Sequence, residues 1–121
     1  MELSTSVREV GDVIVADFKG RIVLGEESAH LRKLVSELLS EGKKKILFNL
    51  AEVTYIDSSG LGNLINALAQ VRKGGGELKL VNLPQKAQDL MQVTKLYTVF
   101  DVLDDEATAV RSFSKASSAA R

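Results

Sequence analysis

The stretch Asp57-Ser58-Ser59-Gly60 places two hydroxyl side chains between a carboxylate and a glycine. A serine there could be a catalytic nucleophile, a site that another enzyme modifies, or part of a helix cap. The nucleophile motif G-x-S-x-G needs a glycine two residues before the serine, where Ile56 precedes Ser58. The only histidine available as a general base is His30, which falls in a helical pattern. Such a lone histidine is more often structural or solvated, so the hydrolase interpretation is weak.

Nucleotide and metal motifs are incomplete in this chain. The segment "GLGNLI" (60–65) has only the first two glycines of the dinucleotide fingerprint, and "EGKKK" (41–45) lacks the upstream glycine and the Ser/Thr of a P-loop. A phosphate could still bind the free amides at the start of a 58–73 helix, which is a generic property of helices. The acidic side chains lack companion ligands at metal-binding spacing. They are Asp57, Asp101, Asp104, Asp105 and Glu106. We therefore expect no metal and no cofactor.

A helix cap explains part of the stretch. Asp57 or Ser58 suits the N-cap position, where a side-chain oxygen accepts a hydrogen bond from an amide of the first turn. Gly60 and Gly62 are harder to explain, because a glycine inside a helix costs up to about 1 kcal/mol relative to alanine. Two glycines indicate that something approaches the backbone closely there. On the residues alone, a cap without further function stays an open alternative.

The first half of the chain alternates between strand and helix patterns. Residues 1–20 suggest two short antiparallel strands joined by a tight turn at Gly11-Asp12. A helix with Gly42 as its stop follows, and the run from Ile46 to Leu50 indicates a strand covered on both faces. The helix is predicted from apolar residues at a spacing of three and four, namely Leu31, Leu34, Val35, Leu38 and Leu39.

The second half continues the alternation. A helix is predicted from Ser58 to "KGGGE" (73–77), then a strand at "LKLVNL" (78–83), then a helix with Pro84 at its first position. The inner face of that third helix is expected to contain Ala87, Leu90, Met91 and Thr94. "YTVFDVL" (97–103) suggests a late strand, and "DDEATAVRSF" (104–113) begins a closing helix.

This order predicts a single α/β domain. It opens with a β-hairpin and continues with alternating β-α units, which form a mainly parallel, curved sheet flanked by about four helices. Residues 1–113 are expected to form the domain. Residues 114–121, which are small and polar, are expected to form a disordered tail.

Composition narrows the classes of partner and compartment. Sixteen basic and sixteen acidic residues cancel, so no net charge favours nucleic acid or an anionic membrane. The absence of cysteine excludes disulfides and thiolate sites. The N-terminus lacks a signal-peptide pattern, and no apolar run reaches the roughly 20 residues that span a bilayer. We expect a cytoplasmic protein that neither contacts nucleic acid directly nor inserts into a membrane.

The string from Asp57 to Gly62, after "ILFNLAEVTYI" (46–56), resembles the signature of the STAS domain, and in particular that of bacterial anti-sigma factor antagonists. The resemblance extends from the opening hairpin through "GGELKLVNL" (75–83) to the final helix. It implies a regulatory switch and not an enzyme. In this family the unmodified antagonist binds an anti-sigma factor that is also a GHKL-type serine kinase, which frees a sigma factor. The kinase then phosphorylates the serine after the aspartate, and a serine phosphatase reverses the modification.

Carried onto this chain, the resemblance implies that Ser58 is the phosphorylated residue. Asp57 would position it, and Ser59 would be a neighbouring hydroxyl that is less favoured as the acceptor. Leu61 could face either the partner or the core. Phosphoserine adds about −1.5 to −2 charges, which a helix N-terminus tolerates but a docked interface does not. The partner-binding surface is expected to contain Asp57, Ser58, Ser59, Gly60, Leu61, Gly62 and Asn63. We expect a monomer or a weak homodimer.

One position departs from the family pattern. Antagonists often have an acidic residue three positions beyond the glycine that matches Gly20, where this chain has Val23. Glu26 and Glu27 come slightly later. Because of this departure, the resemblance does not fix the identity of the partner. Two alternatives are a STAS accessory subunit of a membrane transporter that docks its ATPase, and a nucleotide or small-molecule sensor.

Overall fold

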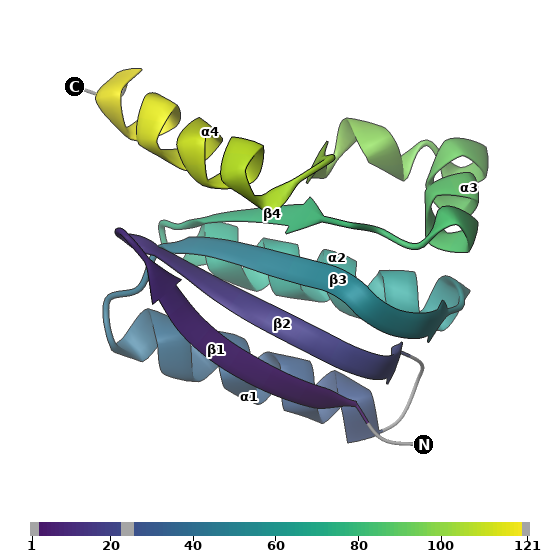
Figure 1. Cartoon of the computed structure of the whole chain (residues 1–121). Coiled ribbons are helices and arrows are strands. Elements are labelled where there is room, and N and C mark those ends of the chain that lie inside the picture. Colours follow the sequence, from purple (N-terminus) through teal and green to yellow (C-terminus); the bar gives the residue numbers. More distant parts are fainter. Residues whose placement is uncertain (1–2, 23–25, 120–121) are drawn as a thin grey trace.

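The chain folds around a five-stranded mixed sheet. The computed structural model describes residues 3–22 and 26–119, and side chains at 3–22, 29–96 and 98–113. Strands β1 (Ser4–Val10) and β2 (Val13–Ile22) form an antiparallel hairpin, as the sequence predicts. Gly11 lies in its turn with a φ of 63°, a conformation that glycine adopts without strain. The hairpin forms one edge of the sheet (Figure 1).

The remaining strands continue from β2 as a parallel array. They are β3 (Lys45–Ile56), β4 (Glu77–Val81) and β5 (Asp101–Leu103), in the order β1-β2-β3-β4-β5. Strand β3 is longer than the apolar run that predicts it, because its second half stays paired with β2 as far as Ile22 and Ile56. The predicted α/β domain with an opening hairpin and a mainly parallel sheet is therefore confirmed.

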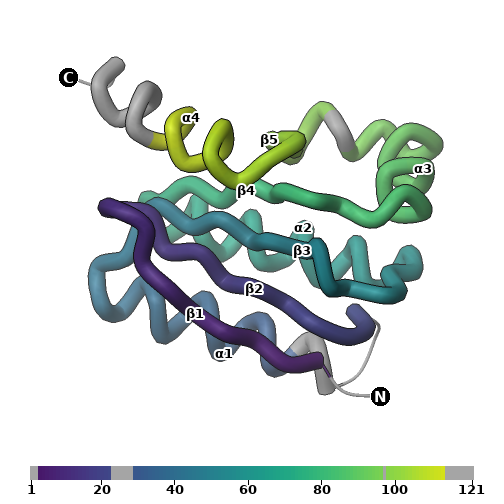
Figure 2. The backbone as a smooth tube through the Cα atoms, in the orientation of Figure 1, coloured from purple at the N-terminus to yellow at the C-terminus, as the bar shows by residue number. Residues whose placement is uncertain are grey.

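Four helices cover this sheet. They are α1 (Glu26–Ser40), α2 (Ser58–Lys73), α3 (Gln85–Thr94) and α4 (Glu106–Ala119). Helices α1 and α2 lie side by side behind the strands, and the C-terminal helix α4 lies near β4 (Figures 1 and 2). None of the helices described between residues 26 and 119 is long and apolar enough to cross a membrane.

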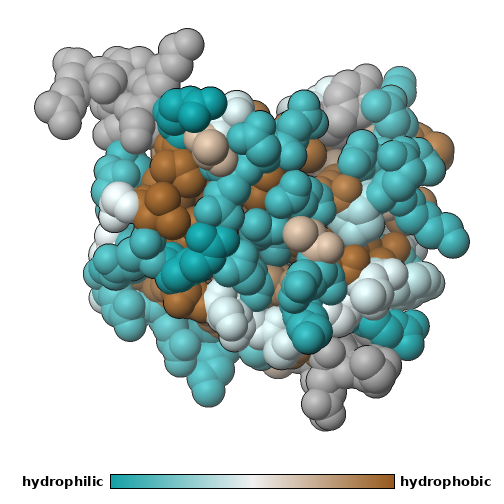
Figure 3. Space-filling model, viewed as in Figure 1, coloured by the Kyte–Doolittle hydropathy of each residue, from teal (hydrophilic) through white to brown (hydrophobic). Residues whose placement is uncertain are grey.

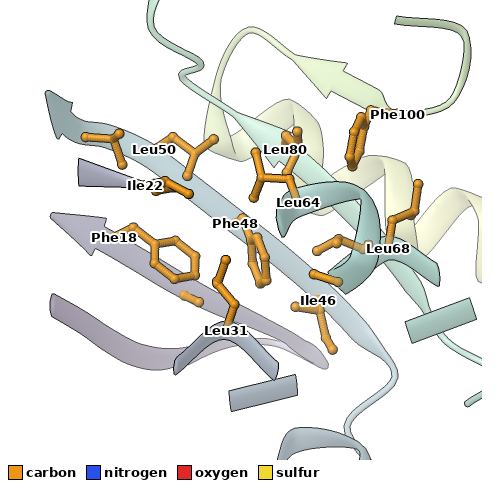
Figure 4. Close-up of a cluster of buried hydrophobic side chains, with 14 of the residues drawn as sticks. Phe18, Ile22, Leu31, Ile46, Phe48, Leu50, Leu64, Leu68, Leu80 and Phe100 are labelled. Carbon is orange, nitrogen blue, oxygen red and sulfur yellow. The ribbon is translucent and has the colours of Figure 1, made fainter. Parts of the chain in front are cut away.

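Alternating strand residues supply two hydrophobic clusters on opposite faces of the sheet. In the larger cluster, Phe18 and Phe48 meet edge to face at 4.7 Å between ring centroids, and Leu31 and Leu64 cover them from the helices (Figure 4). The smaller cluster lies beneath α4. It consists of Val13, Val15, Leu47, Val81, Ala109 and Phe113. The sheet is therefore buried on both faces where α4 covers it, as expected for parallel strands.

Two expectations in the second half were wrong in detail. Pro84 is the N-cap of α3 and not its first helical residue, because its ψ of 148° is extended. "YTVFDVL" (97–103) is only partly a strand, since Leu96–Thr98 form a 3-10 turn and β5 holds three residues. Lys95 adopts a left-handed conformation that ends α3, and the turn then directs Phe100 into the core. Packing thus overrides the local strand preference.

Two further expectations concern the inner face of α3 and the C-terminal segment. Ala87 and Met91 are buried as predicted, whereas Thr94 is exposed and donates its hydroxyl to the Leu90 carbonyl at 2.7 Å. Helix α4 continues to Ala119, into the segment 114–121 assigned to a tail. The division of the chain at residue 113 stays a prediction.

A polar network holds the start of α4 on the sheet. Arg8 of β1 donates to Asp17 of β2 at 2.6 Å (Nε to Oδ2) and to Glu106, the first residue of α4, at 2.9 Å (Nη1 to Oε2). Asn49 of β3 donates a further hydrogen bond to Glu106 at 3.1 Å. Hydrophilic side chains cover much of the face of the molecule that is viewed in Figures 1 and 3. The hydrogen bond from Arg8 is the main cause that lowers the pKa of Glu106 below its ordinary value.

This network predicts how stability depends on acid. A carboxylate with a lowered pKa stabilises the fold above its ordinary value of 4.5, and that contribution is lost as pH falls below it. Glu106→Gln should remove about 0.5–1 kcal/mol at pH 7, a small effect because Arg8 is partly exposed, and it should flatten the loss of stability below pH 4.5. Urea unfolding between pH 3 and pH 7 measures both. Asp104→Asn is the control, and superimposable curves for wild type and Glu106→Gln would contradict the prediction.

Candidate functional site

The predicted site lies where β3 passes into α2, at the carboxyl ends of the parallel strands. Ile56 ends β3, Ser58 begins α2, and Asp57 is the single residue between them. In Figure 1 this junction lies beyond the arrowhead of β3. The carboxyl ends of strands are where open α/β sheets usually present functional groups.

Asp57, and not Ser58, is the N-cap of α2. Its backbone is extended, and its Oδ1 accepts a hydrogen bond from the Gly60 amide at 2.8 Å. Its carbonyl accepts from the Leu61 amide at 3.0 Å, the first bond of the helix. Because Asp57 satisfies the cap, the Ser58 side chain is not needed for it. Within the described part of the chain, the exposed Ser58 hydroxyl makes no hydrogen bond.

Gly60 has a packing role that sequence alone did not reveal. A Cβ on Gly60 would lie 1.9 Å from the carbonyl oxygen of Ile22 and 3.1 Å from Cγ2 of Ile56. The first turn of α2 therefore rests directly on the end of β2. The close approach predicted from the paired glycines occurs within the molecule at this position. A Cβ on Gly62, by contrast, would meet no described atom within 4 Å beyond its own helix backbone and chain neighbours.

The seven residues expected to contact a partner divide by burial. Ser58 is exposed, and Asp57, Ser59 and Gly62 are partly exposed. Gly60, Leu61 and Asn63 are buried, and Leu61 packs into the core at 2% exposure. The folded chain therefore does not expose all seven residues of the expected partner-binding surface. The exposed surface narrows to the cap and the outer side of the first helical turn.

A neighbouring pair of side chains was not predicted as part of the site. Arg21 and Tyr55 are register partners at the ends of β2 and β3, and the guanidinium carbon lies 4.9 Å from the centroid of the Tyr55 ring. This distance is typical of a cation–π contact. Tyr55 is 38% exposed, unusual for a large aromatic side chain. The sequence carries one signal for the exposure of Tyr55. This residue directly precedes the apolar Ile56, and neighbouring residues of a strand face opposite sides of the sheet.

Other residues singled out from the sequence lie elsewhere. His30 is exposed on α1, and its Nε2 lies 2.6 Å from the Thr5 hydroxyl. Val23 lies outside the described residues, as do the side chains of Glu26 and Glu27, so the departure from the family pattern stays a prediction. Among the residues with described positions, no three His, Asp or Glu side chains form a possible metal site.

The two glycines of the first turn make a matched pair for testing the packing. Gly60→Ala should lower the free energy of unfolding by about 1–3 kcal/mol, because the methyl group would overlap a backbone carbonyl that cannot move alone. Gly62→Ala should raise it by up to about 1 kcal/mol, because the site is open and alanine favours a helix. Urea unfolding of both variants checks this, and equal effects would contradict the assigned contact.

The chain matches a known domain family and known proteins over most of its length. The STAS domain model matches residues 4–109. The chain is 30% identical over 102 residues to the anti-sigma-B factor antagonist of Bacillus subtilis. That alignment covers 84% of this chain and 92% of the antagonist. The crystal structure of TM1081 from Thermotoga maritima superimposes with a TM-score of 0.80 at 27% identity, covering 89% of this chain and 92% of that one.

A further likeness concerns the fold alone. The Bacillus cell fate determinant SpoIIAA in its phosphorylated form has a TM-score of 0.67 at 18% identity, covering 90% of this chain and 99% of that one. The family model spans nearly all of the described chain, and the relatives are covered over most of their length. The chain therefore belongs to the STAS domain family, among the anti-sigma factor antagonists, which are regulators and not enzymes.

Proposed function

We propose that this protein is an anti-sigma factor antagonist switched by phosphorylation of Ser58. Its unphosphorylated form binds an anti-sigma factor that is also a GHKL-type serine kinase, and this binding releases a sigma factor. A serine phosphatase restores the binding form. The observation that carries the proposal is the exposed, uncommitted hydroxyl of Ser58 next to the Asp57 cap in a chain of this family.

Exposure favours Ser58 over Ser59 as the phosphorylated residue. A kinase must bring the γ-phosphate of ATP in line with the hydroxyl, so the acceptor side chain has to be accessible. Ser58 is exposed, whereas Ser59 is half-buried. Asp57 acts as a positioning residue, because its bond to the Gly60 amide fixes the turn that presents Ser58.

The same location explains how a phosphate could change binding without unfolding the domain. The free amides of a helix N-terminus favour negative charge, and the first turn of α2 has no acidic side chain of its own. The added charge of about −1.5 to −2 is therefore tolerated in the free protein. At a docked surface it would face the partner beside the Asp57 carboxylate and would require desolvation. Each 1.4 kcal/mol of that penalty, roughly, reduces affinity tenfold.

Phosphate mapping tests the acceptor. We expect incubation with ATP and the GHKL-type kinase captured from the source cells to add a single phosphate at Ser58, located by mass spectrometry. Ser58→Ala should abolish it, and Ser59→Ala should not. In a binding assay, the phosphorylated protein should bind the kinase at least about tenfold more weakly than the unmodified protein.

Several outcomes would contradict this function. Phosphate at another residue, or undiminished labelling of Ser58→Ala, would remove Ser58 from its role. Equal affinity of the two forms would remove the switch. Capture of an ABC-type ATPase in place of a kinase would favour the transporter subunit, and calorimetric binding of a nucleotide would favour the sensor.

A further inference from the structure

A groove of ≈ 500 Å³ lies between α1 and α2, on the face of the sheet that carries both helices. Its polar lining comes from Arg32 and Ser36 of α1 and from Asn63, Asn66, Gln70 and Lys73 of α2. Buried Leu31 and Ala67 also line it. No role in the core explains this hollow, since its polar side chains add nothing to apolar packing.

The groove follows from the pattern of α2. Ser59, Asn63, Asn66, Gln70 and Lys73 recur at steps of four and three residues, so they lie along one face of the helix. Most of these side chains are short, and Asn is a weaker helix former than Glu or Lys. The Gln70 side-chain amide spans the helices, donating to the Ser36 hydroxyl at 2.8 Å and to the Arg32 carbonyl at 3.3 Å. This side chain therefore fixes the spacing of the two helices on either side of the groove.

The charge of the groove has one sign. Arg32 and Lys73 are exposed, and neither forms an ion pair with any residue that the structure describes. No carboxylate is among the described side chains that line the groove, and α2 contains no Asp or Glu at all. Glu37 of α1 lies outside the lining. The Gln70 amide already donates both of its hydrogens within the chain, so the donors between the two cations are the Asn66 amide and the Ser36 hydroxyl. Two cations with these donors between them form a surface complementary to carboxylates.

We propose that this groove docks an acidic segment of the protein that acts at Ser58. The polar face of α2 connects the two places, because Ser59 in the first turn lies one turn from Asn63 in the groove. From Asn63 to Lys73 the helix rises about 15 Å, which matches about five residues of extended chain. This inference rests on the proposed function for the identity of the partner, and on the groove itself for the chemistry.

Charge reversal tests the groove with the full-length protein. Arg32→Glu combined with Lys73→Glu should weaken binding to the kinase at least about tenfold at low salt, and wild-type affinity should fall as salt is added. The control is Lys33→Glu combined with Lys86→Glu. It changes the net charge equally at exposed positions outside the groove and should leave affinity close to wild type. Equal loss of affinity in both double variants would overturn the proposal.

A second measurement does not depend on Ser58. We expect a glutamate-rich decapeptide, titrated into the ¹⁵N-labelled protein, to shift the side-chain amide signals of Asn66 and Gln70, and a lysine-rich decapeptide to leave them unchanged. Shifts located elsewhere, or equal for both peptides, would overturn the groove. Groove-specific shifts without phosphorylation of Ser58 would refute the proposed function alone. Phosphorylation of Ser58 with neither groove effect would refute this inference alone.

Discussion

The contact between the first turn of α2 and the end of β2 is the constraint on which the functional end of this molecule depends. At Gly60 the helix backbone meets the carbonyl of Ile22 so closely that even a methyl group would overlap it. The contact joins two elements that are adjacent in the fold but distant in sequence. It sets the depth at which α2 starts, and therefore the height of Ser58 above the sheet.

The cap and the proposed switch are one arrangement and not competing explanations of the same residues. Asp57 satisfies the helix amides, Gly60 allows the close packing, and Ser58 is left exposed between them. The cost of a glycine in the first turn is offset by the packing that it permits. A modification at Ser58 would therefore change the charge of a surface that is anchored by the Asp57 cap and the Gly60 contact, next to the buried core of the sheet.

Much of this arrangement follows from local sequence rules, and the remainder depends on tertiary contacts. The period of Leu61 and Leu64, and the capping chemistry of Asp57, predict the start of α2 correctly. The partner of Gly60 could not be predicted, because it is a backbone atom on another strand. Likewise the strand preference of residues 97–103 gave way to the burial of Phe100. The groove was not predicted because it needs α1 opposite the polar face of α2.

As proposed, phosphate at Ser58 should alter a surface and leave the fold unchanged. ¹H–¹⁵N spectra recorded before and after stoichiometric phosphorylation distinguish these two effects. We predict amide shifts confined to the first turns of α2 and to the strand ends that meet it, including Ile22 and Ile56. Shifts throughout the core, for example at Phe48 and Phe113, would contradict the claim, because they would show that the modification acts by rearranging the domain.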